Sequence, residues 1–216
     1  MQAMNKVLQG QQYIANFLDQ PLGIGSIFRM DDKQSILARE FSDSFPSVDL
    51  ARYTSTGSRG TLKFSEQASV SITFGASATT TLGESAVALK FKRARTAAGA
   101  FNDAFVASLR YDAILEQLRK LWVDQGYVNY RREYFLVFEV VTAASGTFIY
   151  SEDRNNEIVL KHTLGEPVTK LADLGSGNFE YVSNTKRTLE IIRTIAHKPL
   201  FKAFRFKANW EPEVLG

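Results

Sequence analysis

The sequence predicts an α+β fold with a mainly antiparallel twisted sheet and a few packed helices. Several segments alternate apolar and polar residues with a period of two, which is typical of strands with one buried face. One segment, from residue 112 onward, has helical spacing instead. The strand segments lack the regular strand–helix–strand order of parallel sheets, which favours antiparallel pairing. The length of 216 residues fits a single domain over 1–216, with a short C-terminal tail at 209–216.

The composition is that of an ordinary globular protein, with 44% hydrophobic and 23% charged residues. The absence of cysteine excludes disulfides, zinc–thiolate sites and thiol nucleophiles. The N-terminal residues lack the apolar run of a signal peptide, and no window approaches the roughly 18–20 apolar residues of a spanning helix. We therefore expect a chain that is made in the cytoplasm. The net charge is only +3, so an electrostatic function must depend on local clusters.

The N-terminal part of the chain is expected to form one helix and two short strands. Residues 4–18 have roughly helical apolar spacing, which predicts a short amphipathic helix through Met4, Val7, Leu8, Ile14, Phe17 and Leu18. Two short apolar runs, 22–30 and 35–41, flank the turn-prone Asp31 and Asp32 and predict two strands. Residues 42–60 are rich in Ser, Gly and Asp and predict a loop with at most a short strand.

Residues 61–95 contain the clearest strand pattern in the chain. From Thr61 to Phe74 apolar and polar residues alternate, with Glu66 as the exception, over a run longer than the usual ~5–6 residues of a strand. The alternation resumes at Val87 in the opposite phase, so the small residues after Phe74 must contain a turn or a bulge. Small polar strands specify register weakly, which makes this segment a candidate for rearrangement.

The second half of the chain is expected to contain a helix followed by strands. Apolar spacing after Asp112, taken as the N-cap, predicts a helix through Ile114, Leu115, Leu118, Leu121 and Trp122. A shorter helix is expected before it, over Phe101–Leu109. The apolar run Glu133–Val141 predicts a central strand that is buried on both faces. Further strands are expected at 147–150, 157–163, 179–182 and 188–196, and a basic strand at 199–210.

The sequence offers little for catalysis. It has two histidines: His162, in a strand-like run, is expected at the surface or in a hydrogen bond, and His197 is expected in a turn. No HExxH, GxSxG or Walker-type motif is present. The carboxylates are scattered and indicate no acid–base pair. We expect no catalytic residue, no metal ligand and no cofactor, so the protein is not expected to be an enzyme.

Basic residues gather in two windows, and aromatic residues are interleaved with them. The window between Glu84 and Asp103 contains no acid but holds the cations Lys90, Lys92, Arg93 and Arg95. The window from Tyr181 to Trp210 contains one acid, Glu190, and the cations Lys186, Arg187, Arg193, Lys198, Lys202, Arg205 and Lys207.

Such windows fit three interpretations. One is a strand edge protected against aggregation. The second is a surface for anionic membranes, at about 1 kcal/mol per cation. The third is a surface for nucleic-acid phosphates. The sequence has neither an RRM pattern nor a GxxG helix–turn motif, so no nucleic acid is expected.

The order of these parts resembles the pore-forming domain of the gasdermins, and most nearly that of the short bacterial ones. The resemblance begins with the alternating run Thr61–Phe74 and the small-residue break after it. It continues through the segments SAVALKFKRARTAAGAFNDAF, AILEQLRKLW, YFLVFEVVTAASGTFIYS, GSGNFEYVSNTKRTLEI and LFKAFRF. It is a similarity in the order and the composition of the segments.

The resemblance implies a membrane pore-forming effector of cell death, of the kind that serves bacterial immunity and antiviral defence. Gasdermin-like domains stay soluble while inhibited and then refold two regions into long amphipathic hairpins, which many subunits join into a membrane β-barrel. For the first hairpin it implies the membrane-inserting residues Leu62, Phe64, Val70, Ile72, Phe74, Val87, Leu89 and Phe91. The second hairpin is implied over 148–162 and 179–196. The cations of both windows are implied to bind acidic lipid headgroups.

The same resemblance implies acidic lipids and further copies of the chain as partners, and a move from the cytoplasm to the inner membrane on activation. Two features depart from the bacterial gasdermins. The chain has no N-terminal cysteine that could be lipidated, and few residues follow Trp210. We therefore expect inhibition by a separate chain or by this short end, or an already active chain, and we keep a separate protease as a partner.

A competing interpretation is a soluble α+β binding module. Such a module would recognise an anionic partner, namely a lipid headgroup, a nucleic acid or an acidic protein, through its basic strand. It would never insert into a membrane.

Overall fold

The computed structural model of the chain describes residues 6–8, 13–17, 20–30, 35–40, 48–65, 69–75, 83–124 and 133–215. The chain divides into two compact units. Unit 1 comprises Met1–Ser58, Phe105–Thr142 and Lys198–Gly216, and unit 2 comprises Arg59–Ala104 and Ala143–His197. The strands pair mainly antiparallel and few helices accompany them, so the predicted α+β class is confirmed.

The described part of unit 1 is an antiparallel sheet on which the α-helix α2 (Leu115–Asp124) packs. In sheet order its strands are β1, β2, β15, β10 and β9, with β3 and β4 joined to β10, β5 to β9 and β16 to β15. Their bounds are β1 Lys6–Leu8, β2 Tyr13–Ala15, β3 Ser26–Met30, β4 Ser35–Glu40, β5 Thr54–Thr56, β9 Thr96–Leu109, β10 Tyr134–Ala143, β15 His197–Phe206 and β16 Pro212–Val214. β9 contributes residues 105–109 to unit 1 and 96–104 to unit 2.

The described part of unit 1 also contains the 3-10 helices η1 (Leu50–Tyr53) and η4 (Tyr111–Ile114), and the α-helix α2 (Leu115–Asp124). α2 follows η4 directly, which confirms the helix predicted after Asp112. Arg110, and not Asp112, occupies the N-cap of η4. The apolar face of α2 is buried in a core with the sheet that includes Leu118, Trp122, Phe138, Phe204 and Phe206.

The helix expected over residues 4–18 is wrong, because Lys6–Leu8 and Tyr13–Ala15 are the paired strands β1 and β2. β2 also pairs with β15, where Phe201 lies opposite Ile14. Ile14 is fully buried there. Partners that are distant in sequence thus outweigh the local helical spacing, and valine, isoleucine and tyrosine fit a pleated surface well.

The helix expected over Phe101–Leu109 is also wrong, since these residues belong to β9. β9 has β11 on one side and β6 on the other, and residues 96–101 are buried in succession. Between Phe101 and Leu109 only Ala104 is buried, and the residues around it are intermediate or exposed, so this part of β9 has no period-two alternation that would have indicated a strand. The central strand predicted over Glu133–Val141 is confirmed as β10, in which residues 135–138 are buried in succession.

Unit 2 consists of two long β-hairpins that lie side by side, each bent into two layers. The first hairpin runs through β6, β7, β8 and β9, and the second through β11, β12, β13 and β14. The first layer has the order β6–β9–β11–β14 and the second the order β7–β8–β12–β13. The bounds are β6 Gly60–Ser65, β7 Val70–Phe74, β8 Ala86–Phe91, β11 Ser145–Ser151, β12 Asn156–His162, β13 Phe179–Asn184 and β14 Thr188–Arg193, with the 3-10 helices η3 Gly83–Ser85 and η6 Leu171–Ser176. The strands predicted near 147–150, 157–163, 179–182 and 188–196 are thereby confirmed.

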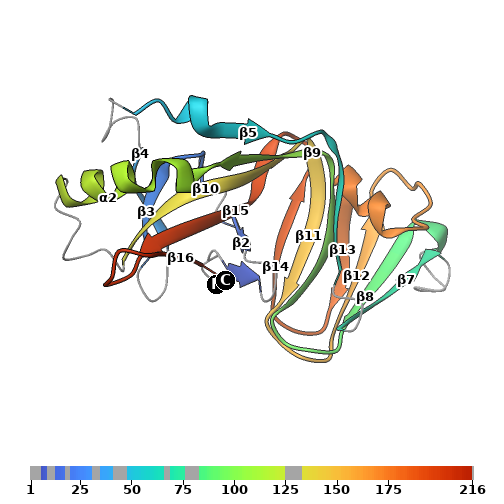
Figure 1. Ribbon diagram of the computed structural model, residues 1–216. Helices are drawn as coiled ribbons and strands as arrows, with labels where there is room; N and C mark the ends of the chain where they lie inside the picture. The colour runs from blue at the N-terminus through green and yellow to red at the C-terminus, as the bar shows by residue number, and fades with distance from the viewer. Residues whose placement is uncertain are drawn as a thin grey trace. The chain divides into compact units, whose positions relative to one another are not determined.

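The main core of unit 2 lies between its two layers. The first layer contributes Ala98, Ala100 and Ile149, and the second contributes Val70, Val87, Leu89, Phe91, Ile158, Leu160 and Phe179. Each described strand pair of unit 2 joins two strands of the same layer. The layers are therefore connected by this core and by the chain segments between them, and Figure 1 shows strands of one layer continuing into strands of the other.

The alternating run Thr61–Phe74 contains two strands, β6 and β7, and is not one long strand. β6 pairs with β9 in the first layer, whereas β7 pairs with β8 in the second. An alternating pattern reports which face of a strand is buried but not whether the strand bends into another layer. Residues 66–68, the small-residue segment 76–82 and the turn at Asp31 and Asp32 lie outside the described residues.

Candidate functional site

Three connections between the layers meet at one end of unit 2. They are residues 92–95 between β8 and β9, 152–155 between β11 and β12, and 185–187 between β13 and β14. The strand register brings them together, because Ser151 lies opposite both Thr96 and Thr188. Figure 1 shows these turns at the lower end of β8, β11 and β14.

Hydrogen bonds tie these connections to one another. The Lys186 Nζ donates to the Arg154 carbonyl oxygen at 2.7 Å, and the Glu152 N–H donates to the Arg187 carbonyl oxygen at 3.4 Å. The Lys92 N–H donates to the Ser69 carbonyl oxygen at 2.8 Å, which places the approach to β7 at the same end. The turns are thus held by two backbone–backbone hydrogen bonds and by one from the Lys186 side chain to the backbone.

We call the exposed cations at this end the basic edge: Lys90, Lys92, Arg93, Arg95, Arg154, Lys186 and Arg187. Three acids lie at the same end, Glu152, Asp153 and Glu157, and Glu157 pairs with Lys90 at 3.9 Å. Among the residues that the structure describes, no carboxylate forms an ion pair with Lys92, Arg93 or Arg95. Such a group of exposed guanidinium and ammonium groups is suited to phosphate oxygens, which arginine can bind in a bidentate manner.

The structure separates the predicted lipid-binding residues into different places. Arg193 lies at the other end of β14 from the basic edge, opposite Gly146. Lys198, Lys202, Arg205 and Lys207 belong to unit 1.

Two of these unit 1 cations have partners within their own sheet. The Lys202 Nζ lies 3.0 Å from a Glu139 carboxylate oxygen and 4.5 Å from the centre of the Tyr13 ring. The Arg205 Nε donates to Glu213 at 2.6 Å. The cations of the second window are therefore divided: Lys186 and Arg187 lie at the basic edge of unit 2, and the others lie elsewhere.

Sequence reasoning missed Arg154. Its neighbours Glu152 and Asp153 cancel its charge in any linear window. Only the pairing of Asn156 with Phe91, and of Ser151 with Thr188, brings it beside the other cations. No local signal in the sequence could have found it.

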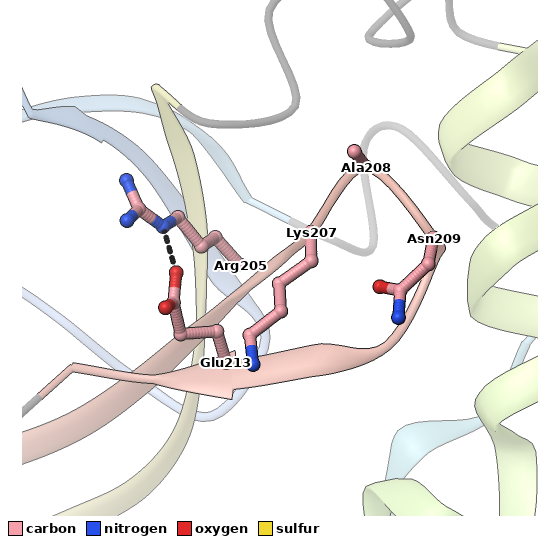
Figure 2. Close-up of a pocket in the computed structure, with 5 residues that line it drawn as sticks. All are labelled: Arg205, Lys207, Ala208, Asn209 and Glu213. Carbon is pink, nitrogen blue, oxygen red and sulfur yellow. Dashed lines mark hydrogen bonds and ion pairs between the residues drawn. The ribbon is translucent and has the colours of Figure 1, made fainter.

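A pocket of about 390 Å³ in unit 1 lies beside the turn between β15 and β16. Figure 2 shows its lining residues, Arg205, Lys207, Ala208, Asn209 and Glu213. The guanidinium of Arg205 is directed at Glu213, as the dashed line marks. A carboxylate that already engages the arginine makes this pocket a weaker anion site than the basic edge.

The predicted membrane-inserting residues belong to both layers of unit 2. Leu62 and Phe64 lie on β6 of the first layer, where Phe64 packs on the rings of Phe101 and Phe148. The others lie on β7 and β8 of the second layer and face the core between the layers: Val70, Ile72, Phe74, Val87, Leu89 and Phe91.

The second layer has two faces of opposite character. Its inner face is the apolar one just described, extended by Ile158, Leu160 and Phe179. Its outer face carries exposed polar side chains from all four strands: Ser71, Thr73, Lys90, Glu157 and Glu180. This layer is therefore an amphipathic four-stranded sheet.

A polar pocket of about 350 Å³ in unit 2 contains His162, which is buried and hydrogen-bonded. The Glu166 N–H donates to His162 Nδ1 at 3.3 Å, so the ring proton is on Nε2, which lies 3.3 Å from Ser176 Oγ. Ser176 Oγ also accepts from the Asn178 N–H. This tautomer donates a proton to the serine, whereas a base that activates a nucleophile must accept one.

A scan against models of protein families and a search of curated proteins found no match for this chain. Within the described ranges, no helix is both long and apolar enough to cross a membrane. Among the same residues, no group of His, Cys, Asp and Glu side chains could hold a metal ion.

Proposed function

We propose that this protein is a membrane pore-forming effector that docks on acidic lipid through its basic edge and inserts the second layer of unit 2. The main observation behind this proposal is that residues 60–104 and 145–193 form two adjacent long hairpins. The second layer of these hairpins is amphipathic. This arrangement supports the function that the gasdermin resemblance implies.

The amphipathic second layer can exchange one apolar partner for another. In water its inner face is covered by Ala98, Ala100 and Ile149 of the first layer. In a membrane, acyl chains would cover the same face, and the outer face with Ser71 and Glu157 would line water. A transmembrane strand needs about 9–11 residues. β12 has 7, so each arm would lengthen by a few residues taken from the segments at the hairpin tips.

The basic edge lies where the two layers join. If the second layer enters the membrane, the cations at 92–95, 154 and 186–187 therefore come to the level of the lipid headgroups. Each cation near an anionic surface contributes about 1 kcal/mol. The edge thus supplies both attraction to acidic lipid and a limit to the depth of insertion.

We propose that the inserted protein is an oligomer, and the outer strands of the second layer support this part of the proposal. β7 and β13 are the two ends of this four-stranded sheet. Open strand edges in lipid would leave backbone groups without hydrogen bonds, which costs several kcal/mol per group. Inserted layers from neighbouring copies would satisfy these edges by pairing with one another.

The test is dye release from liposomes that contain anionic lipid. We expect Lys92→Glu, Arg93→Glu and Arg95→Glu together to lower release at least tenfold. The matched control is Arg52→Glu, Arg110→Glu and Lys120→Glu, which changes the net charge equally at exposed positions of unit 1. The control should release dye nearly as fast as the wild type.

Two outcomes would contradict the proposal. If both triple variants released dye at the same rate, the basic edge would have no role in pore formation. Sedimentation of the wild-type protein with acidic liposomes, without dye release or oligomers, would favour the soluble binding module instead.

A further inference from the structure

We propose that residues 163–178, which join β12 to β13, form a clasp that keeps the second layer closed on the first. Release of this clasp is the step that frees the hairpins to insert. The inference rests on the proposed function and names the contacts that regulate it. The connections at the basic edge serve as the hinge, and the clasp lies at the opposite end of the strands.

The clasp reaches from the tip of the second layer back to the first layer. Its helix η6 packs against β11 and β6. The Ser145 Oγ donates to the Gly175 carbonyl oxygen at 2.6 Å. Gly175 lies against the side chain of Asn102, so closely that a Cβ at this glycine would lie 2.6 Å from Asn102 Cγ. Both partners, Asn102 on β9 and Ser145 on β11, belong to the first layer.

The clasp also seals the core and holds the other hairpin. Val168 and Leu174 are almost completely buried and belong to the core between the layers. The Val168 N–H donates to the Glu84 carbonyl oxygen at 2.8 Å, which ties the clasp to η3 at the tip of the first hairpin. One segment therefore fastens both hairpin tips.

The clasp is folded on itself and so can detach as one piece. The Asp173 carboxylate accepts from the N–H groups of Thr169 and Lys170, at 2.9 and 3.0 Å. The Thr163 N–H donates to the Asn178 carbonyl oxygen at 2.8 Å and closes the base of the loop. These bonds lie within the clasp and survive its release.

Separation of the two layers breaks few hydrogen bonds between the described strands. The described strand pairs of unit 2 all lie within one layer, so none of these ladders opposes separation. What opposes it is the apolar core, which lipid would replace, and the contacts of the clasp with Asn102 and Ser145. A covalent bond at this point should therefore trap the closed state.

The chain contains no cysteine, so an introduced pair forms a unique disulfide. Asn102→Cys with Gly175→Cys places two Cβ atoms near the ~3.5–4.5 Å spacing of a disulfide. The matched control is Lys161→Cys with Glu180→Cys, which lie opposite each other on β12 and β13 within the second layer. Both disulfides cross-link unit 2, but only the first joins the two layers.

We expect the oxidised Asn102→Cys/Gly175→Cys protein to release dye from anionic liposomes at least tenfold more slowly than its reduced form. A reductant should restore release, and the control pair should be indifferent to oxidation. Ser145→Ala, which removes the donor to Gly175, should speed release severalfold. Undiminished release by the oxidised protein would overturn the clasp while leaving the pore proposal intact.

Hydrogen exchange in solution separates failure of the clasp from failure of the pore. Oxidation of the Asn102→Cys/Gly175→Cys pair should slow amide exchange of the clasp residue Val168, whose N–H donates to Glu84 while the clasp is closed, at least tenfold without any membrane. If the wild type releases no dye but oxidation of the cysteine pair slows amide exchange, the pore proposal is wrong and the clasp proposal is supported. If exchange does not change on oxidation, the clasp is overturned.

Discussion

Glu139 connects four strands of unit 1 through its carboxylate. Tyr13 of β2 donates to one oxygen at 2.5 Å, Ser108 of β9 donates to the other at 2.9 Å, and Lys202 of β15 lies 3.0 Å away. Glu139→Gln keeps the size but leaves the half-buried Lys202 without its counter-charge. We expect a loss of about 1–3 kcal/mol in the free energy of unfolding, measured with urea at neutral pH. Glu133→Gln is the control, since it breaks an exposed pair with Arg29 and should cost less than about 1 kcal/mol.

The pH dependence of the same variant tests the charge of Glu139. Burial opposes ionisation, but hydrogen bonds from Tyr13, Lys202 and Ser108 hold the pKa of Glu139 below its ordinary value. A lowered folded-state pKa means that the carboxylate stabilises the fold above its unfolded-state pKa. This contribution is lost as the pH falls through the folded-state pKa. The difference between wild type and Glu139→Gln should therefore shrink below about pH 4. A constant difference down to about pH 3 would show that charge is not the cause.

At the scale of elements, the close approach of β9 and β11 depends on Gly99. A Cβ at Gly99 would collide with the Thr147 carbonyl oxygen and lie 2.7 Å from Phe148 Cα. Both obstacles are backbone atoms, so the strands would have to separate. We expect Gly99→Ala to cost about 1–3 kcal/mol or more in thermal unfolding. Gly60→Ala on β6 meets nothing within 4 Å and should be neutral or slightly stabilising. Equal losses for both variants would contradict this packing.

The helices and strands that could be predicted are those whose pattern of buried residues is evident in a short stretch of the sequence. The strand β10 follows from its apolar run, and α2 follows from its helical spacing. β1 and β2 have three residues each, which is too few to distinguish a period of two from helical spacing. The burial of residues along β9 follows neither of these two patterns. β2 pairs with the distant strand β15, and β9 pairs with the distant strand β11, and a local pattern does not contain such pairing.

The candidate site was predictable to a similar extent. The cations from Lys90 to Arg95 stand together in the sequence, and the structure keeps them together at the basic edge. Arg154 joins them only through strand register, whereas Lys202 and Arg205 leave the group because carboxylates within unit 1 engage them. Counting charges along the sequence shows neither which carboxylate pairs with a cation nor where in the fold the cation lies.

At the scale of the whole molecule, the proposed insertion concerns unit 2, whereas both tryptophans belong to unit 1. Trp122 is fully buried, with its ring 5.5 Å from that of Phe206, and Trp210 contacts the same ring at 5.7 Å. Tryptophan emission therefore reports on the fold of unit 1. Hydrogen exchange in β7, β8, β12 and β13 reports on the second layer of unit 2. The two signals can be followed in one liposome experiment.

If only the second layer of unit 2 moves into the membrane, hydrogen exchange in that layer should change while tryptophan emission does not. On anionic liposomes we expect exchange in β12 and β13 to change together with dye release, while tryptophan emission stays at its buried wavelength. The Trp210→Phe variant leaves Trp122 as the sole emitter and should give the same result, because Trp122 lies in the core that α2 forms with the sheet of unit 1. Urea-unfolded protein supplies the emission of an exposed tryptophan for comparison. A shift toward that emission in step with dye release would mean that the core of unit 1 also opens, and insertion by unit 2 alone would then be wrong.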